Sequence, residues 1–308
     1  MSQRSQQRFV VVHRKSRMQE LVQRFNTWPQ ARFYLEHNHV DVQDYLDEHD
    51  VYQQRLSEVE RCLKERGRFQ WLERGLLPNY QFSPDDIVVV IGQDGLVANT
   101  LKYLKGQRVI AINPDPARWD GQLLPFKVGD LEEILAQVEA NRARIKSVTF
   151  AEASTNDGQT MLAVNDLFIG PKSHTSARYR LSWNGQTENH SSSGIIVSTG
   201  MGSSGWFQSI LAGAMGVTGE ASHPLKKGFA WDDRWLQFAV REPFPSQNTG
   251  TSLVFGEVTE SKPLTLESLM PENGVVFSDG VEQDYISFNS GCILTIGISQ
   301  NQGSLVSP

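Results

Sequence analysis

The chain is poor in cysteine, with Cys62 and Cys292 as the two cysteines among its 308 residues. Zinc sites and disulfide frameworks need cysteines at close, repeated spacings, and these two lie far apart. The sequence therefore predicts neither kind of site. It favours a reducing compartment, and we expect a cytoplasmic location.

The sequence also lacks long hydrophobic runs and an excess of basic residues. No stretch approaches the roughly 20 consecutive apolar residues that a membrane helix requires. The 29 Lys and Arg residues stand against 35 Asp and Glu residues, which gives a net charge of -6. Because binding DNA or RNA needs a basic surface, we expect neither a membrane nor a nucleic acid as partner.

The first half of the chain alternates short apolar runs with amphipathic segments. Residues 9–12, 87–91 and 109–112 are rich in apolar and β-branched side chains, as buried strands are. Residues 44–66 carry apolar side chains at helical spacing, and residues 131–140 predict another helix. This alternation predicts a Rossmann-like, mostly parallel sheet covered by helices, with ligands at the carboxyl ends of its strands.

After about Ser147 the pattern changes to alternating polar and apolar residues, which is typical of half-buried strands. Tyr179, Leu181 and Trp183 alternate in this way before the hairpin signal Asn184-Gly185. The sequence predicts one helix, at residues 203–214, and further strands at residues 235–240, 253–258, 274–277 and 293–298.

A chain of 308 residues can form two cores of about 150 residues each. The change of pattern predicts an α/β domain at residues 1–146 and a β-rich domain at residues 147–308, with a linker near residues 142–148. Whether the last residues return to the first domain is left open. The long strands of the second domain have edges that must be covered or paired, which favours a homodimer.

The most informative motif is the turn Gly92-Gln93-Asp94-Gly95, directly after the strand at residues 87–91. Gly92 and Gly95 let the backbone approach a bulky anion, and a helix expected at residues 96–104 would point its first N–H groups toward that anion. Asp94 would then lie beside bound phosphates. Asn113 ends the next strand and is expected at the same edge of the sheet.

Two further polar clusters follow. One is the pair Asn165-Asp166, and the other is the glycine and hydroxyl run at residues 198–205, directly after the strand-like run 195–197. The helix predicted from Ser203 would offer a second positive helix end to an anion. Three such clusters in one chain indicate phosphate chemistry better than a single glycine turn does.

In order and spacing, these clusters resemble the NAD kinase family. Members of that family carry a Gly-Gly-Asp-Gly turn, an Asn-Glu or Asn-Asp pair, and a Thr-Gly-Ser cluster. The resemblance covers most of the chain. The segments that resemble the mitochondrial-type branch are residues 113–118, 168–170, 192–194 and 240–243, together with Trp206.

The resemblance implies the fold of NAD kinases and diacylglycerol kinases, in which a Rossmann-like α/β nucleotide-binding domain precedes a β-rich dinucleotide-binding domain. It implies transfer of the γ-phosphate of ATP to the 2′-hydroxyl of the adenosine ribose of NAD or NADH, with Mg²⁺, to give NADP or NADPH. It also agrees with a homodimer.

Residue roles follow from the resemblance. Asp94 polarises the ribose hydroxyl or accepts its proton, and such a carboxylate beside a glycine-lined phosphate site suits phosphoryl transfer. The residues implied around the nucleotides are Gly92, Gln93, Gly95, Asn113, Asn165, Asp166, Thr199, Gly202 and Ser203. No residue is assigned as a metal ligand.

Two departures from the family leave alternatives open. Gln93 replaces the second glycine of the turn, where it could donate a hydrogen bond to phosphate or crowd it, so one alternative is a non-catalytic dinucleotide sensor. Met201 replaces a threonine that helps to recognise adenine, so the other alternative is a kinase of the same fold acting on a lipid or sugar hydroxyl. Asp279-Gly280 has two equally good interpretations, an acidic turn of the family and a plain hairpin turn.

Overall fold

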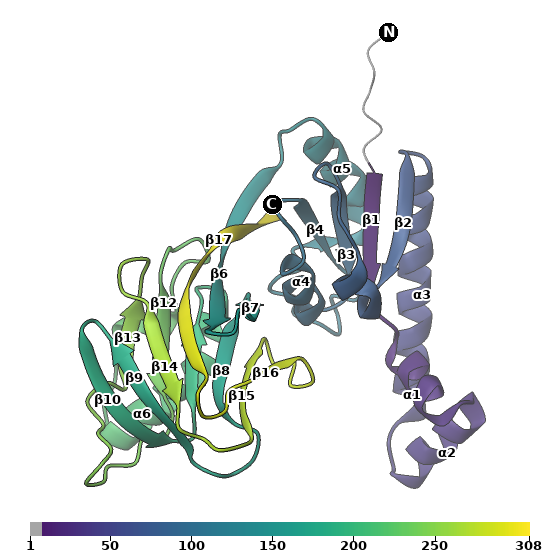
Figure 1. The fold of residues 1–308 in the computed structure, drawn as a ribbon. Helices are drawn as coiled ribbons and strands as arrows, with labels where there is room; N and C mark the ends of the chain where they lie inside the picture. Colours follow the sequence, from purple (N-terminus) through teal and green to yellow (C-terminus); the bar gives the residue numbers. More distant parts are fainter. Residues whose placement is uncertain (1–7) are drawn as a thin grey trace. The chain divides into compact units, whose positions relative to one another are not determined.

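The computed structural model describes residues 8–308, which form two compact units. The first unit comprises the chain up to Ile145 together with Ser304–Pro308, and the second comprises Lys146–Gly303. Figure 1 shows helices and strands alternating in the first unit and strands dominating the second. The predicted fold class, an α/β domain followed by a mostly β domain, is confirmed.

The first unit is built on a parallel sheet with the strand order β5-β4-β3-β1-β2, and the end of β17 also pairs with β4. Its strands are β1 (Arg8–His13), β2 (Arg68–Glu73), β3 (Ile87–Ile91), β4 (Arg108–Asn113) and β5 (Phe126–Lys127). Its helices are α1 (Arg17–Phe25), α2 (Trp28–His37), α3 (Val42–Lys64), α4 (Asp94–Leu101) and α5 (Leu131–Glu139). Short 3-10 turns cover Arg74–Asn79 and Val128–Asp130.

Burial explains this arrangement. All five residues of β3 are buried, as expected for a strand covered on both faces. One core contains Val11, Val89 and Ile110 of the sheet together with Val59 of α3 and Leu135 of α5, so α3 and α5 cover the same face. The sheet edge that carries the glycine turn therefore belongs to a closely packed sheet, which limits its movement.

The second unit is a β-sandwich with one long helix, α6 (Trp206–Thr218). One sheet is antiparallel with the order β13-β12-β11-β8-β15-β16, and the opposite sheet contains β10-β9-β14-β17 with β6 and β7. The strands are β6 (Arg144–Thr155), β7 (Thr160–Ala163), β8 (Asp166–Pro171), β9 (Ala177–Trp183), β10 (Gln186–Ser192), β11 (Ile195–Ser198), β12 (Leu236–Val240), β13 (Phe255–Val258), β14 (Leu264–Ser268), β15 (Gly274–Ser278), β16 (Tyr285–Ser287) and β17 (Ile293–Ser307). Short 3-10 turns cover Gly202–Ser204 and Pro224–Lys227.

Strand alternation builds the core of the sandwich. Leu167 and Ile169 of β8 pack with Leu264 and Leu266 of β14 from the opposite sheet. Because side chains alternate along a strand, Asp166 and Phe168 of β8 lie on its other face. The hairpin predicted at Asn184-Gly185 joins β9 to β10, and both residues have the positive φ of a type I′ turn (50° and 74°).

Other features differ in detail from the sequence expectations. The change between the units falls inside β6, so the segment expected as a linker is the start of a strand. Ser304 and Leu305 of β17 pair with β4 in the first unit. Across residues 8–308, no helix combines the length and the apolar character needed to cross a membrane.

Candidate functional site

The glycine turn lies between β3 and α4 at the carboxyl edge of the parallel sheet. The Gly92 N–H donates to the carbonyl of Ile112 (3.3 Å), which ties the turn to β4. Helix α4 begins at Asp94, two residues earlier than expected, with Gln93 as N-cap. The Gln93 side chain does not cap the helix, so N–H groups of the first turn are left for another acceptor.

Asp94 is therefore the first residue of α4, where a carboxylate is favoured by the helix dipole. One of its oxygens, Oδ1, accepts the backbone N–H of Leu123 (2.9 Å), and the residue is half-buried. This bond fixes the acid against the loop that follows β4. Gly95 is exposed, and no atom lies within 4 Å of where a Cβ would stand, so its backbone is open to an approaching group.

Asn113 is buried and shapes the loop after β4. Its Nδ2 donates to the carbonyl of Trp119 (2.9 Å), and its Oδ1 accepts the N–H of Asp115 (3.0 Å). Both polar ends of the side chain are thus used within one loop. Direct contact of Asn113 with a nucleotide stays a prediction.

A buried cluster that the sequence analysis did not identify supports the turn. The Tyr52 hydroxyl of α3 donates to the carbonyl of Ile91 (3.0 Å) and accepts the N–H of Arg14 (3.1 Å), so it joins the ends of β3 and β1. Burial raises the pKa of Tyr52 to about 12, which keeps the donor protonated. Arg14 pairs with the buried Glu48 at 2.7 Å. In the sequence, the signal for this cluster was an arginine, Arg14, two residues after the strand predicted at residues 9–12.

A second ionic cluster lies on the same elements. Asp44 of α3 pairs with Arg17 (2.7 Å) and with Arg118 of the loop after β4 (2.5 Å). Hydrogen bonds from Arg17 and then Arg118 hold the pKa of the Asp44 carboxyl below its usual value. These contacts hold the loop after β4 against α1 and α3.

In the second unit, Asn165, Asp166 and Thr199 come together. The Thr199 N–H donates to the carbonyl of Asn165 (2.9 Å), and its hydroxyl donates to the carbonyls of Val164 (2.5 Å) and Asn165 (3.1 Å). Thr199 is fully buried, so its hydroxyl holds the Asn165 turn instead of facing a pocket. The Asn165 carboxamide makes no hydrogen bond within the described residues.

The glycine and hydroxyl cluster packs closely on the same turn. Ser203 is buried, and its hydroxyl donates to the carbonyl of Gly200 (2.6 Å) and accepts the N–H of Phe229 (3.0 Å). Helix α6 begins at Trp206, three residues later than expected, because a 3-10 turn comes first. Met201 is only 5% exposed, so its side chain lies mainly inside the protein.

Gly202 is expected to tolerate no side chain. A Cβ there would lie 2.0 Å from the carbonyl oxygen of Asn165. Gly202→Ala should therefore lower the free energy of unfolding by about 3 kcal/mol, measured by urea denaturation. Gly213→Ala in α6 is the control, because it meets no atom within 4 Å and should stabilise the helix by about 0.5–1 kcal/mol. An unchanged urea midpoint for Gly202→Ala would contradict the close packing.

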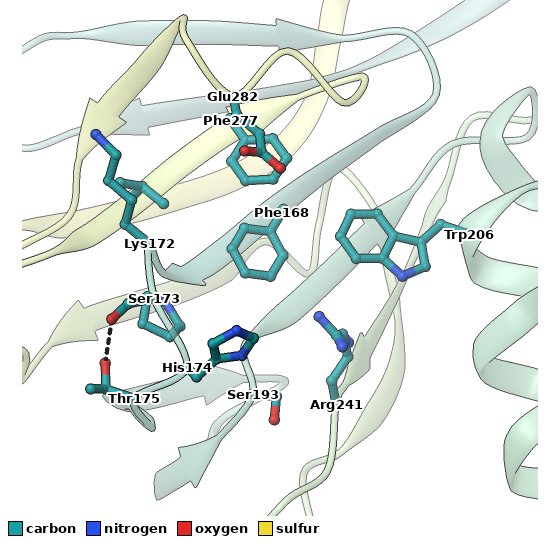
Figure 2. A pocket seen from close by; sticks show the side chains of 12 residues that line it. Phe168, Lys172, Ser173, His174, Thr175, Ser193, Trp206, Arg241, Phe277 and Glu282 are labelled. Atoms are coloured by element: carbon teal, nitrogen blue, oxygen red, sulfur yellow. Dashed lines mark hydrogen bonds between the residues drawn. The ribbon is translucent and has the colours of Figure 1, made fainter. Parts of the chain in front are cut away.

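A pocket of about 420 Å³ lies on the outer face of the six-stranded sheet, next to α6. Figure 2 shows Phe168 between Phe277 and Trp206. The ring centroids of Phe168 and Trp206 are 5.7 Å apart and nearly parallel (5°), and those of Phe168 and Phe277 are 4.8 Å apart. The Arg241 guanidinium lies 5.4 Å from the Trp206 ring centroid.

The rim of this pocket is polar. Lys172, His174 and Ser193 line it with Arg241, and Glu282 supplies a single carboxylate. Aromatic faces next to basic side chains suit a planar ring attached to an anionic group. Phe168 is two residues from Asp166 on the same face of β8, and from Phe168 the pocket lining extends along β8 to Pro171 and into the loop that follows.

Solved structures that resemble this chain include the following two. An NAD kinase from Archaeoglobus fulgidus in complex with ATP has a TM-score of 0.59 and 17% sequence identity, covering 97% of this chain and 93% of that one. Yeast NADH kinase complexed with NADH has a TM-score of 0.63 and 12% identity, covering 99% and 84%. No family model and no curated protein matches the sequence. At these identities the likeness establishes the fold, which is that of NAD kinases.

Proposed function

We propose that the protein is a kinase that transfers the γ-phosphate of ATP to the 2′-hydroxyl of the adenosine ribose of NAD or NADH. The observation that carries the proposal is Asp94, a carboxylate at the first turn of α4, directly after a glycine turn and fixed by the Leu123 N–H. The two structures of the same fold, one with ATP and one with NADH, support it.

In the first unit, the backbone of Gly92 and Gly95 and the start of α4 would bind phosphates, with Asp94 accepting the proton of the attacking hydroxyl. Mg²⁺ usually binds one or two protein carboxylates together with substrate phosphates. The described residues contain no group of three or more His, Cys, Asp or Glu side chains fit for a metal. Mg²⁺ carried on the ATP phosphates would neutralise phosphate charge, and Asp94 would be the protein carboxylate beside it.

In the second unit, the Asn165 carboxamide and Asp166 would hydrogen-bond a ribose or the nicotinamide, and the aromatic pocket would take a planar ring. Thr199, Gly202 and Ser203 would act by shaping this turn. The hydroxyls of Thr199 and Ser203 bond to backbone carbonyls of the protein, and Gly202 packs against the Asn165 carbonyl. A stack of three aromatic rings favours a dinucleotide over an aliphatic lipid chain or a sugar.

The two alternatives rest on Met201 and Gln93. Met201 is buried, which weakens the argument for a lipid or sugar acceptor. Gln93 is half-buried, and its carboxamide has no hydrogen-bond partner in the described part of the chain. It can therefore donate a hydrogen bond to a phosphate, which supports the phosphate-binding role of the turn.

An acceptor panel tests the proposal. We measure ADP formation with each acceptor and expect kcat/KM to be higher for NAD or NADH than for diacylglycerol or hexoses. Trp206→Ala should raise the KM for the dinucleotide about 2- to 10-fold with kcat little changed, because ring stacking contributes about 0.5–1.5 kcal/mol. Trp231→Ala, a half-buried tryptophan outside the pocket, is the matched control. A lipid or sugar as best acceptor would refute the proposal.

The proposal includes a homodimer, a cytoplasmic location and membership of the mitochondrial-type branch. Support for the dimer comes from α6, which has no charged residue and exposes Val217 at 90%. Exposed apolar helix faces favour association. Sedimentation velocity showing only monomer at working concentration would count against the dimer.

A further inference from the structure

We propose that Asp279 is a positioning residue for dinucleotide binding, which it serves by fixing the backbone of Asn165. This inference rests on the proposed function of the Asn165-Asp166 turn. Asp279 follows β15 and precedes Gly280 in the hairpin to β16. The sequence left two interpretations of Asp279-Gly280, an acidic turn of the family and a plain hairpin turn. The Asp279 carboxylate makes contacts outside the hairpin, which a plain hairpin turn does not require.

The Asp279 carboxylate accepts three successive backbone N–H groups. Its Oδ1 accepts from Asn165 (2.7 Å), Val164 (3.1 Å) and Asp166 (3.3 Å), and its Oδ2 accepts from Val164 (3.2 Å). Successive N–H groups around one anion form a nest. Hydrogen bonds to a charged acceptor are stronger than neutral ones, so this nest fixes the turn firmly.

The hairpin brings Asp279 to this place. Asp279 and Gly280 have φ values of 54° and 72°, and the Val281 N–H donates to the carbonyl of Ser278 (3.0 Å), as in a type I′ turn. The Asp279 N–H also donates to the carbonyl of Asp166 (3.0 Å). Pairing of β15 with β8 thus continues into the turn.

Asn165 is held on both sides of its backbone. Asp279 accepts its N–H, while Thr199 donates two hydrogen bonds to its carbonyl. Gly202 packs on the same carbonyl without room for a Cβ. The side chain of Asn165, the group without an internal partner, therefore projects from a fixed backbone. A preorganised donor and acceptor binds its ligand without the cost of being ordered on binding.

Asp279→Asn isolates the role of the charge. Asparagine tolerates positive φ, so the hairpin is retained. Its Oδ1 can still accept N–H groups, but the negative charge is lost and an NH₂ group replaces the Oδ2 that accepts from Val164. We expect the Kd for NAD, measured by calorimetry without ATP, to rise about tenfold. Asp157→Asn is the matched control, because Asp157 also precedes a turn glycine in the second unit and, among residues 8–308, bonds only within its own turn. Its Kd should stay within about twofold.

A double-mutant cycle separates positioning from general destabilisation. Asn165→Ala should weaken NAD binding about tenfold, and adding Asp279→Asn should weaken it no further, because the side chain that Asp279 positions is then already absent. Amide hydrogen exchange at residues 164–166 should also become faster in Asp279→Asn. Kinetics at saturating NAD should show kcat changed by less than about threefold.

The outcomes are distinct. Additive losses in the double variant, or unchanged exchange at residues 164–166, would overturn the positioning role alone. A wild-type protein that binds neither NAD, NADH nor NADP would overturn the proposed function and this inference with it. Coupled losses with faster exchange and unchanged kcat would establish the role.

Discussion

Asp94→Asn is expected to lower kcat for NADP formation by about 10²–10⁴-fold, the usual contribution of a general base. Asparagine has nearly the same shape as aspartate, and its Oδ1 can still accept the Leu123 N–H, so the loop after β4 should keep its place. The dinucleotide Kd should stay within about threefold, since Asp94 acts on the hydroxyl that reacts. Steady-state kinetics and calorimetry measure both quantities.

Asp120→Asn provides the control for this variant. Asp120 is an exposed acid of the same unit, in the loop after β4, so its change alters the net charge equally. We expect its kcat to equal that of the wild type. If Asp94→Asn keeps the wild-type rate, Asp94 is not the catalytic acid or base and the proposed mechanism is wrong.

Gly95→Ala is expected to lower kcat/KM for ATP by about 10²-fold without harming the fold. Gly95 lies in the first turn of α4, and a Cβ there would meet no protein atom within 4 Å. Alanine is the better helix former, so the free energy of unfolding should stay constant or rise by up to about 1 kcal/mol. A methyl group at this place would displace phosphates that approach the backbone, and a shift of 1 Å can cost about 10²-fold in rate.

Gly216→Ala in α6 is the matched control, because it is also a helical glycine with open space around it. It should change neither kcat nor KM. Urea denaturation of both variants tests the stability. Full activity in Gly95→Ala would place the phosphates elsewhere and contradict the proposed role of the turn.

The central strands of the first unit were predictable because buried parallel strands are continuous apolar runs. The run predicted at residues 87–91 coincides with β3. The start of α4 was predicted less well. Aspartate is a favoured N-cap, yet Gln93 takes that position and Asp94 lies one residue inside the helix. The contact with Leu123, 29 residues away, cannot be read from local preferences.

The second unit shows what a linear pattern cannot reveal. The hydroxyls of Thr199 and Ser203 were expected to line a pocket, but nearby carbonyls draw both inward. The aromatic pocket combines Phe168 and Phe277, which the pairing of β8 with β15 sets opposite each other, with Trp206 of α6, which packs on Phe168. A signal was present in Phe168 and Phe277, which alternate with core residues and so point away from the core.

The most direct test of the account is to incubate purified protein with ATP, Mg²⁺ and either NAD or NADH, and to measure NADP or NADPH with an NADP-specific enzyme. We predict that the wild type forms product with one ADP for each phosphorylated dinucleotide, and that Asp94→Asn forms almost none. Absence of product from a wild-type protein that binds both ATP and the dinucleotide would contradict the proposed kinase activity.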